Sequence, residues 1–117
     1  MNDPTVLGID IGGTNTKLGL VAPDGAIRSS ARIPTDAQGD NPEPFFSRLF
    51  PAMDALVAEA GADLIGIGIS SHGEVDRERR RPIIAGSTPA LRGVDLRGRV
   101  EARCAGLPVV NRTGGFS

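Results

Sequence analysis

The sequence is poor in aromatic and sulfur-containing side chains. It has no tryptophan and no tyrosine, so four phenylalanines carry all of its aromatic burial and a core must rest on aliphatic side chains. Cys104 is the only cysteine, which excludes an internal disulfide and a multi-cysteine metal site within these 117 residues. One histidine, His72, is too few for a histidine-based metal site.

Strong charge and long apolar runs are also missing. The formal net charge is −1, which gives no broad attraction to nucleic acid or to anionic membranes. Residues 1–4 are polar and lack the charged-then-apolar order of a signal peptide, and no apolar run reaches membrane-spanning length. We therefore expect one small cytoplasmic domain with neither a nucleic-acid nor a membrane partner.

One stretch combines the residue types that hold phosphate. Two apolar runs, residues 5–11 and 18–21, flank a carboxylate, two glycines and two hydroxyl residues. Adjacent glycines permit backbone dihedrals that side chains forbid and let N–H groups approach an anion. A carboxylate at a strand end can hold Mg²⁺, and hydroxyl, amide and ammonium groups can donate to phosphate oxygens. The candidate residues are Asp10, Gly12, Gly13, Thr14, Asn15 and Lys17, with Asp10 as the metal ligand.

The glycine spacing differs from two common phosphate motifs. The dinucleotide fingerprint needs Gly-x-Gly-x-x-Gly before a helix, whereas Gly8 is followed by Gly12 and then by a strand pattern. Gly8 and Gly13 have the spacing of a P-loop, but Thr14 and Asn15 occupy its Lys-Ser/Thr positions. From spacing alone, an ordinary β-hairpin turn is an equally good interpretation.

Hydrophobic patterns predict the element order β-β-β-α-β-α-β. Strands are expected over residues 5–11, 16–22, 26–33, 64–70 and 107–110, the more polar third one near an edge. A helix is expected over residues 45–60, which Pro51 should either kink or restrict to a start near residue 51. A second helix should begin at an Asp95 cap. A hairpin meander followed by parallel crossovers indicates an α/β fold, a mixed sheet flanked by helices.

Three segments carry a family resemblance. Residues 7–21 include Gly8-Ile9-Asp10-Ile11-Gly12-Gly13-Thr14-Asn15, residues 65–76 follow a Gly-Ile-Gly-x-x-x-x-Gly-x-Val-Asp pattern, and residues 87–96 contain Ser-Thr-Pro-Ala-Leu. In this order and spacing they resemble the ROK family of repressors, uncharacterised reading frames and sugar kinases, part of the actin, hexokinase and Hsp70 ATPase superfamily. The similarity runs from Val6 to about Val110.

The resemblance implies an RNase H-like, actin-like ATPase fold. Residues 1–111 would form an incomplete first domain of the two that close around ATP and a sugar in this family. The resemblance assigns Asp10 and the turn at residues 12–14 to the ATP phosphates and Mg²⁺. Lys17 shares a strand face with Asn15 and is a further phosphate contact, although an exposed strand lysine without a role is an equal alternative.

The resemblance also places a second group of residues at a sugar site. Its members are His72, Gly73, Glu74, Ser87 and Asn111. Ser87 stands where many family members have an asparagine that touches a sugar hydroxyl, and serine is shorter. For His72 a solvent-facing or packing role is the alternative. The identity of the sugar is not encoded here, because the family's discriminating residues lie beyond residue 117.

The end of the chain departs from the family pattern. Family members follow this last strand with Asn-Asp, and that aspartate is the general base that accepts the sugar hydroxyl proton. Here Asn111 is followed by Arg112, residues 112–117 do not match, and no acidic residue follows Glu101. A guanidinium stays protonated and has no acceptor, so it cannot act as that base. We therefore expect a truncated or frame-shifted N-terminal fragment of an ATP-dependent glucose- or hexose-type kinase, inactive alone.

Two non-catalytic interpretations stay open. One is a regulatory protein like the family's repressors, although the first strand begins about five residues from Met1 and leaves no room for a DNA-reading helix. The other is a free-standing nucleotide- or sugar-binding module, with self-association through its open sheet face. Family members cover that face with a helix from the far end of the chain, without which apolar sheet surface would stay exposed.

Overall fold

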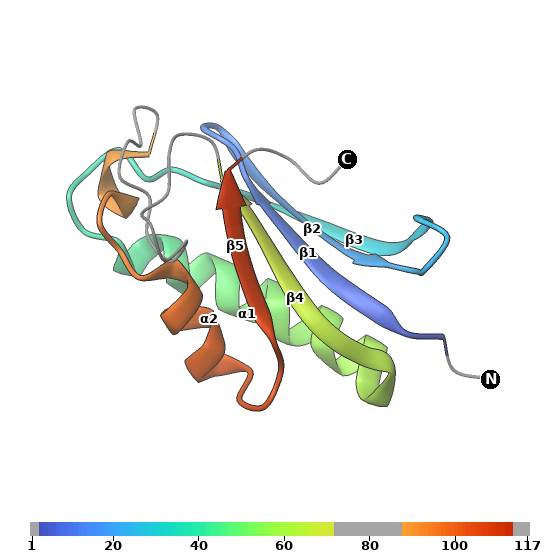
Figure 1. Cartoon of the computed structure of the whole chain (residues 1–117). Helices are drawn as coiled ribbons and strands as arrows, with labels where there is room; N and C mark the ends of the chain where they lie inside the picture. Colours follow the sequence, from blue (N-terminus) through green and yellow to red (C-terminus); the bar gives the residue numbers. More distant parts are fainter. Residues whose placement is uncertain (1–2, 72–87, 114–117) are drawn as a thin grey trace.

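The computed structural model describes residues 3–71 and 88–113, which form one mixed sheet with helices against it (Figure 1). The strands in these ranges are β1 (Thr5–Ile11), β2 (Asn15–Val21), β3 (Ile27–Pro34), β4 (Leu64–Ser71) and β5 (Val109–Thr113). The helices there are α1 (Glu43–Ala60) and α2 (Leu96–Arg103), with 3₁₀ turns η1 (Gly61–Asp63) and η2 (Pro89–Leu91). The predicted element order and the predicted α/β fold class are confirmed.

The sheet has the strand order β3-β2-β1-β4-β5, which places β3 at an edge as predicted. β2 runs antiparallel to β1 and β3, whereas β4 runs parallel to β1 and β5. The crossovers through α1 and α2 both advance toward β5. Because such crossovers are right-handed, both helices lie on one face of the sheet, as Figure 1 shows. The carboxyl ends of β1, β4 and β5 meet at one edge, where open α/β sheets bind ligands.

The helix-covered face of the sheet holds the hydrophobic core. Alternate residues of the central strands point toward α1 and α2, which supply the opposing side chains. The largest fully buried side chains are Phe45, Phe46, Leu7, Ile9, Ile11, Leu18, Leu49, Met53, Leu91, Leu96 and Val100. Nine of these eleven side chains are not aromatic, as a sequence without tryptophan and tyrosine requires.

Two helix boundaries settle details that the sequence left open. Helix α1 starts at Glu43 and continues through Pro51, so the alternative of a start near residue 51 is wrong. Pro44 lies in its first turn, where a missing backbone N–H leaves no intrahelical bond unmade. Asp95 caps α2 as predicted, because its carboxylate accepts a hydrogen bond from the Gly98 N–H at 2.9 Å.

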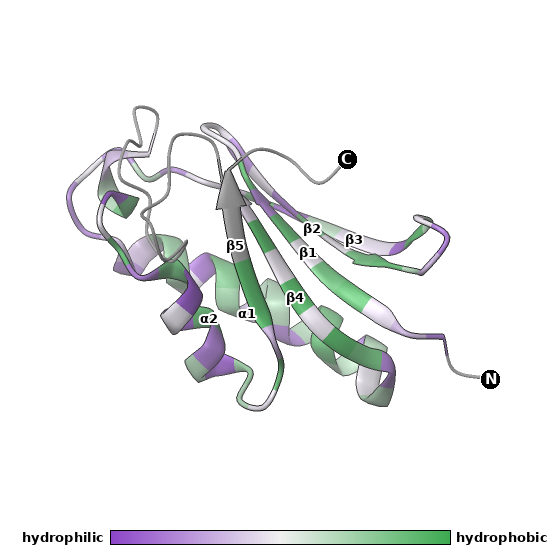
Figure 2. Cartoon of the chain, viewed as in Figure 1, coloured by the Kyte–Doolittle hydropathy of each residue, from purple (hydrophilic) through white to green (hydrophobic). Residues whose placement is uncertain are grey.

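The opposite face of the sheet carries no helix within the described ranges (Figures 1 and 2). A row of glycines crosses its middle, since Gly8 of β1 pairs with Gly19 of β2 and with Gly68 of β4. Val6 and Val110 on this face are 38% and 55% exposed, and both line a cavity of about 270 Å³. None of the described helices has the length and apolar character needed to cross a bilayer.

Candidate functional site

The turn between β1 and β2 brings four of the predicted phosphate-binding residues together. The N–H of Gly12 donates to the carbonyl oxygen of Asn15 at 3.0 Å and closes the turn. A Cβ atom on Gly12 would lie 2.8 Å from that same oxygen, so only glycine fits there. Neither Gly12 nor Gly13 has a positive φ, which corrects the expectation of unusual dihedrals. The glycine at position 12 is needed for close approach of two backbone segments.

Two amides of this turn make no hydrogen bond within the part of the chain that the structure describes. Among the described residues, none accepts a hydrogen bond from the N–H of Gly13 or Thr14. Thr14 is exposed and Gly13 is half-buried, so both groups lie near the surface. The amide of Gly12 is already bonded within the turn and therefore drops out of the predicted donor set.

One row of polar residues crosses the sheet beside this turn. The strand registers align Arg32, Lys17, Asp10, Ser70 and Arg112 across β3, β2, β1, β4 and β5. A cavity of about 440 Å³ over β1, β2 and β3 is lined by Asp10, Lys17 and Arg32. The half-buried carboxylate of Asp10 thus shares a hollow with two cationic side chains that come from neighbouring strands.

The chemistry of Asp10 fits a magnesium ion held together with phosphate. Within the described residues its carboxylate makes no ion pair and no hydrogen bond. No group of three histidine, cysteine or acidic side chains that could cage a metal occurs in those same ranges. Mg²⁺ commonly takes only one or two carboxylates and completes its shell with water and phosphate oxygens. A lone, accessible aspartate is therefore a sufficient protein ligand.

A threonine outside the predicted set holds the turn in place. Thr35, directly after β3, donates its backbone N–H to the Thr14 carbonyl at 2.9 Å and its hydroxyl to the Gly12 carbonyl at 2.8 Å. Its Oγ1 also lies 2.7 Å from Oγ1 of Thr16. Because a hydroxyl has one hydrogen and Thr35 gives its own to Gly12, Thr16 is the donor in this pair. Both side chains are fully buried.

An arginine of α1 in turn holds the segment that carries Thr35. Arg48 donates from Nε to the Pro34 carbonyl at 3.1 Å and from one Nη to the carbonyls of Thr35 and Asp36 at 2.6 and 3.2 Å. Asp36 has a φ of 42°, unusual for a residue other than glycine. The planar guanidinium thus fixes three consecutive carbonyls next to the turn.

The sequence pattern around Thr16 could have indicated this hydrogen-bond network. Thr16 alternates with Leu18 and Leu20 and so occupies a core-facing position of β2, where a hydroxyl must find a partner. Thr35 and Arg48 carried no such signal, since one lies in a polar loop and the other resembles a solvated position between the apolar residues of α1. Ser70 is a further unpredicted feature, because its Oγ is buried without a hydrogen-bond partner among the described residues.

The predicted sugar-site residues are only partly placed. His72, Gly73, Glu74 and Ser87 lie outside the described residues. Asn111 lies on β5, which extends to Thr113 and so runs three residues past its predicted end. The register pairs Asn111 with Ile69 and Arg112 with Ser70, itself the neighbour of Asp10. Residue 112 is therefore two strands away from Asp10 along the sheet. Because adjacent strands are about 4.8 Å apart, their backbones are separated by roughly 10 Å.

Comparisons with known proteins agree with this architecture. A model of the ROK family matches residues 6–113. The chain is 35% identical over 104 residues to a glucokinase of Streptomyces coelicolor, covering 89% of this chain and 31% of the relative. Among solved structures, a ROK family glucokinase from Streptomyces griseus in complex with glucose and AMPPNP is 33% identical, with a TM-score of 0.71 over 93% of this chain and 33% of that one.

A second solved structure extends the comparison. The ROK hexokinase from Thermus thermophilus is 26% identical and has a TM-score of 0.74 over 93% of this chain and 35% of that one. The chain therefore spans about a third of the length of the relatives that it matches. The RNase H-like, actin-like ATPase fold that the sequence predicted is confirmed. By its sequence and by its fold, the chain belongs to the ROK family.

Proposed function

We propose that this chain is the phosphate-holding part of an ATP-dependent sugar kinase of the ROK family. The observation that carries the proposal is the edge of the sheet at which Asp10 pairs with Lys17 beside a turn whose Gly13 and Thr14 N–H groups have no acceptor among the described residues. The named relatives are glucokinases and a hexokinase, and one was solved with glucose and an ATP analogue. We therefore propose a hexose-type substrate, ATP as phosphate donor and action in the cytoplasm.

Each residue of the site has a role that follows from its chemistry. Phosphoryl transfer depends mainly on positioning and on neutralising charge. Asp10 would hold Mg²⁺ against the phosphates, and the ion would supply the larger part of the neutralising charge. The N–H groups of Gly13 and Thr14 would donate to phosphate oxygens. Lys17 would add a cation, and Asn15 a side-chain amide donor.

The sugar side of the proposal rests on the family pattern. His72, Gly73, Glu74, Ser87 and Asn111 would contact the sugar hydroxyls. The position of the family's general base belongs to Arg112, whose guanidinium has no lone pair to accept a proton. We propose that the chain by itself binds nucleotide but transfers no phosphate to sugar. Residues 1–111 would then act as the first ATPase subdomain, with residues 112–117 outside the family pattern.

Calorimetric titration with ATP, with and without Mg²⁺, tests the nucleotide site. Asp10→Ala should abolish the magnesium-dependent part of the binding, because no other carboxylate lies in the aligned polar row. Asp24→Ala is the matched control, since this exposed aspartate lies at the other end of β2. A binding curve of Asp10→Ala identical to that of the unaltered chain would remove Asp10 from the site.

A non-catalytic module that binds nucleotide or sugar, in the manner of the family's regulators, is the second candidate. The presence of Arg112 at the base position favours it. Saturable ATP binding without phosphorylation of any member of a hexose panel would support this module or a kinase fragment. Size-exclusion chromatography with nucleotide would then show whether the chain forms a homo-oligomer. Measurable hexose phosphorylation by the chain would contradict both and would require another general base.

A further inference from the structure

We propose that Thr35 and Arg48 are positioning residues that hold the turn at residues 12–15 in its phosphate-binding shape. We call these two residues the clamp. This inference rests on the function proposed above, because it concerns the same phosphate site. Neither residue lines the cavity that contains Asp10 and Lys17, and neither was expected from the sequence. Their effect on a ligand would pass through the backbone of the turn.

The first step of the argument concerns the peptide unit between Gly12 and Gly13. A trans peptide is planar, so its C=O and its N–H point in opposite directions. The Thr35 hydroxyl binds the carbonyl oxygen of Gly12 at 2.8 Å. This bond ties the carbonyl toward the buried Thr35 and thereby directs the N–H of Gly13 away from it. That N–H is one of the two donors of the turn that have no acceptor within residues 3–71 and 88–113.

The second step concerns why this peptide needs to be held. Glycine has the widest conformational freedom of the amino acids, and two adjacent glycines allow their shared peptide to rotate. A rotated peptide would present a carbonyl oxygen to a phosphate, which repels it. The backbone N–H of Thr35 fixes a second carbonyl of the turn, that of Thr14, two residues further on, at 2.9 Å. One residue therefore restrains both ends of the flexible stretch.

The third step links the turn to helix α1. Thr35 lies after the end of β3, followed by Asp36 with its positive φ, so its own position needs support. Arg48 provides that support through three hydrogen bonds to the carbonyls of Pro34, Thr35 and Asp36. A fork of guanidinium donors can satisfy several carbonyls at once, which a lysine ammonium does less well. Helix α1 thus fixes Thr35, and Thr35 fixes the turn.

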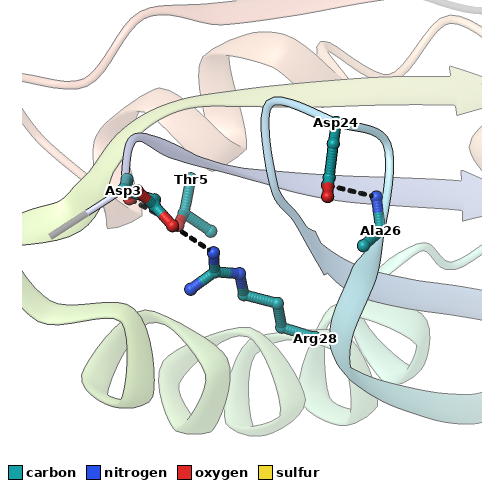
Figure 3. Close-up of polar contacts among 5 residues, drawn as sticks. All are labelled: Asp3, Thr5, Asp24, Ala26 and Arg28. Atoms are coloured by element: carbon teal, nitrogen blue, oxygen red, sulfur yellow. Dashed lines mark hydrogen bonds and ion pairs between the residues drawn. The ribbon is translucent and has the colours of Figure 1, made fainter. Parts of the chain in front are cut away.

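The test compares isosteric variants of two buried threonines. Thr35→Val removes the hydroxyl but keeps the shape, and Thr35→Ser restores the hydroxyl. Thr5→Val is the matched control, because Thr5 is 4% exposed, lies at the far end of β1 and bonds the Asp3 carbonyl at 3.0 Å (Figure 3). Two quantities are measured: the affinity for Mg-ATP and for Mg-tripolyphosphate, and the ¹⁵N relaxation of the Gly13 and Thr14 amides without nucleotide.

The expected results separate positioning from general stability. Thr35→Val should weaken both ligands about tenfold, the equivalent of one lost hydrogen bond, and should raise the mobility of the two amides. Thr35→Ser and Thr5→Val should leave both quantities unchanged. Turn amides in Thr35→Val that are as rigid as in the unaltered chain would overturn the clamp. Equal loss of affinity in Thr35→Val and Thr5→Val would overturn it too.

An arginine pair repeats the test if Thr35→Val does not fold. Arg48→Met should mobilise the same amides, whereas Arg28→Met should not, because Arg28 binds the Asp3 carboxylate at the other end of the sheet (Figure 3). If the unaltered chain binds neither ligand, the proposed function is wrong. The relaxation data, collected without ligand, then decide the clamp alone: mobile amides in Thr35→Val and Arg48→Met support it, and rigid ones overturn it.

Discussion

The β1–β2 turn and the β2–β3 turn join neighbouring strands of one meander, yet glycine serves a different purpose in each. Gly25 of the β2–β3 turn has a φ of 88°, and a Cβ atom added to it would meet nothing within 4 Å. Gly12 of the β1–β2 turn has an ordinary φ but no room for a Cβ. The first glycine is needed for its dihedral and the second for the space it leaves.

The hydrogen bonds of the two turns differ in the same way. The β2–β3 turn bonds three of its amides within itself, since the N–H groups of Ala22 and Gly25 donate to carbonyls of the turn and that of Ala26 donates to the Asp24 side chain at 3.0 Å (Figure 3). The β1–β2 turn is held from outside by Thr35 and, among the described residues, keeps two N–H groups unbonded. The β2–β3 turn is thus held by bonds within itself, whereas the turn proposed to bind phosphate takes its restraint from Thr35.

Of the changes that test this difference between the two turns, Gly12→Ala should have the largest effect. The new methyl group would press against the Asn15 carbonyl oxygen at 2.8 Å, a backbone atom that cannot turn aside as a flexible side chain would. We expect a loss of about 2–3 kcal/mol of unfolding free energy, as for forced overpacking, together with loss of Mg-ATP binding. Urea denaturation and calorimetry measure the two effects. Unchanged binding would show that the shape of the turn does not matter to the ligand.

Gly25→Ala should cost less and should spare the ligand. An alanine Cβ at this position would contact no other residue, so the cost is the backbone strain of a φ of 88° alone. This strain is about 1–2 kcal/mol for an L-residue in the left-handed region. The same urea series should therefore show a smaller destabilisation than for Gly12→Ala. Gly25 lines the end of the cavity that lies away from Asp10 and Lys17, beyond the last residue of β2, so Mg-ATP affinity should equal that of the unaltered chain. A drop in affinity would mean that the two turns are coupled and that the contrast drawn between them is wrong.

Acid should produce the smallest effect, and it should act away from the turn. Hydrogen bonds from Arg99 lower the pKa of Glu43 below its usual 4.5, and Arg103 lowers the pKa of Asp54 in the same way. Both pairs join α1 to α2. A carboxylate with a lowered pKa stabilises the fold above its unfolded pKa, and this contribution is lost as pH falls through the folded value. The urea concentration at the midpoint of denaturation should therefore decrease once the pH is lowered beneath about 4.5.

Glu43→Gln serves as the control for the pH series. It should show a shallower decline, because one of the two titrating pairs is gone. The clamp contains hydroxyl, guanidinium and carbonyl groups but no carboxylate, so the relaxation of the Gly13 amide should not change over the same range. An identical decline in Glu43→Gln and in the unaltered chain would show that the Glu43–Arg99 pair adds nothing.

Local sequence patterns were sufficient to predict most of the fold. The alternation of Leu7, Ile9 and Ile11 predicted a strand, and helical spacing predicted most of α1, because both signals depend on neighbours in sequence. The course of α1 through Pro51 was not predictable with certainty, since tertiary burial of Phe45, Leu49 and Met53 outweighs a local preference. The length of β5 was missed because pairing with β4, a long-range contact, extends it to Thr113.

The site was predictable only where its residues are adjacent in the chain. Asp10 and the glycines lie within a few positions of one another, and the pairing of Asp10 with Lys17 follows from a hairpin. The two clamp residues are distant from the turn in sequence. Thr35 lies 23 positions beyond Gly12, and Arg48 lies further still. The donor role of Thr16 depends on where Thr35 places its hydrogen, which only the folded arrangement fixes.

The one-way order of those hydroxyls has an electronic consequence. Thr16 donates to Thr35, and Thr35 donates to the oxygen of Gly12, so the chain of dipoles ends on an amide. Hydrogen bonds in series polarise one another, and electron density drawn toward that oxygen comes from the nitrogen of Gly13 by amide resonance. The hydrogen on that nitrogen becomes more positive. Two buried threonines thereby make a surface N–H a stronger partner for an anion without touching the anion themselves.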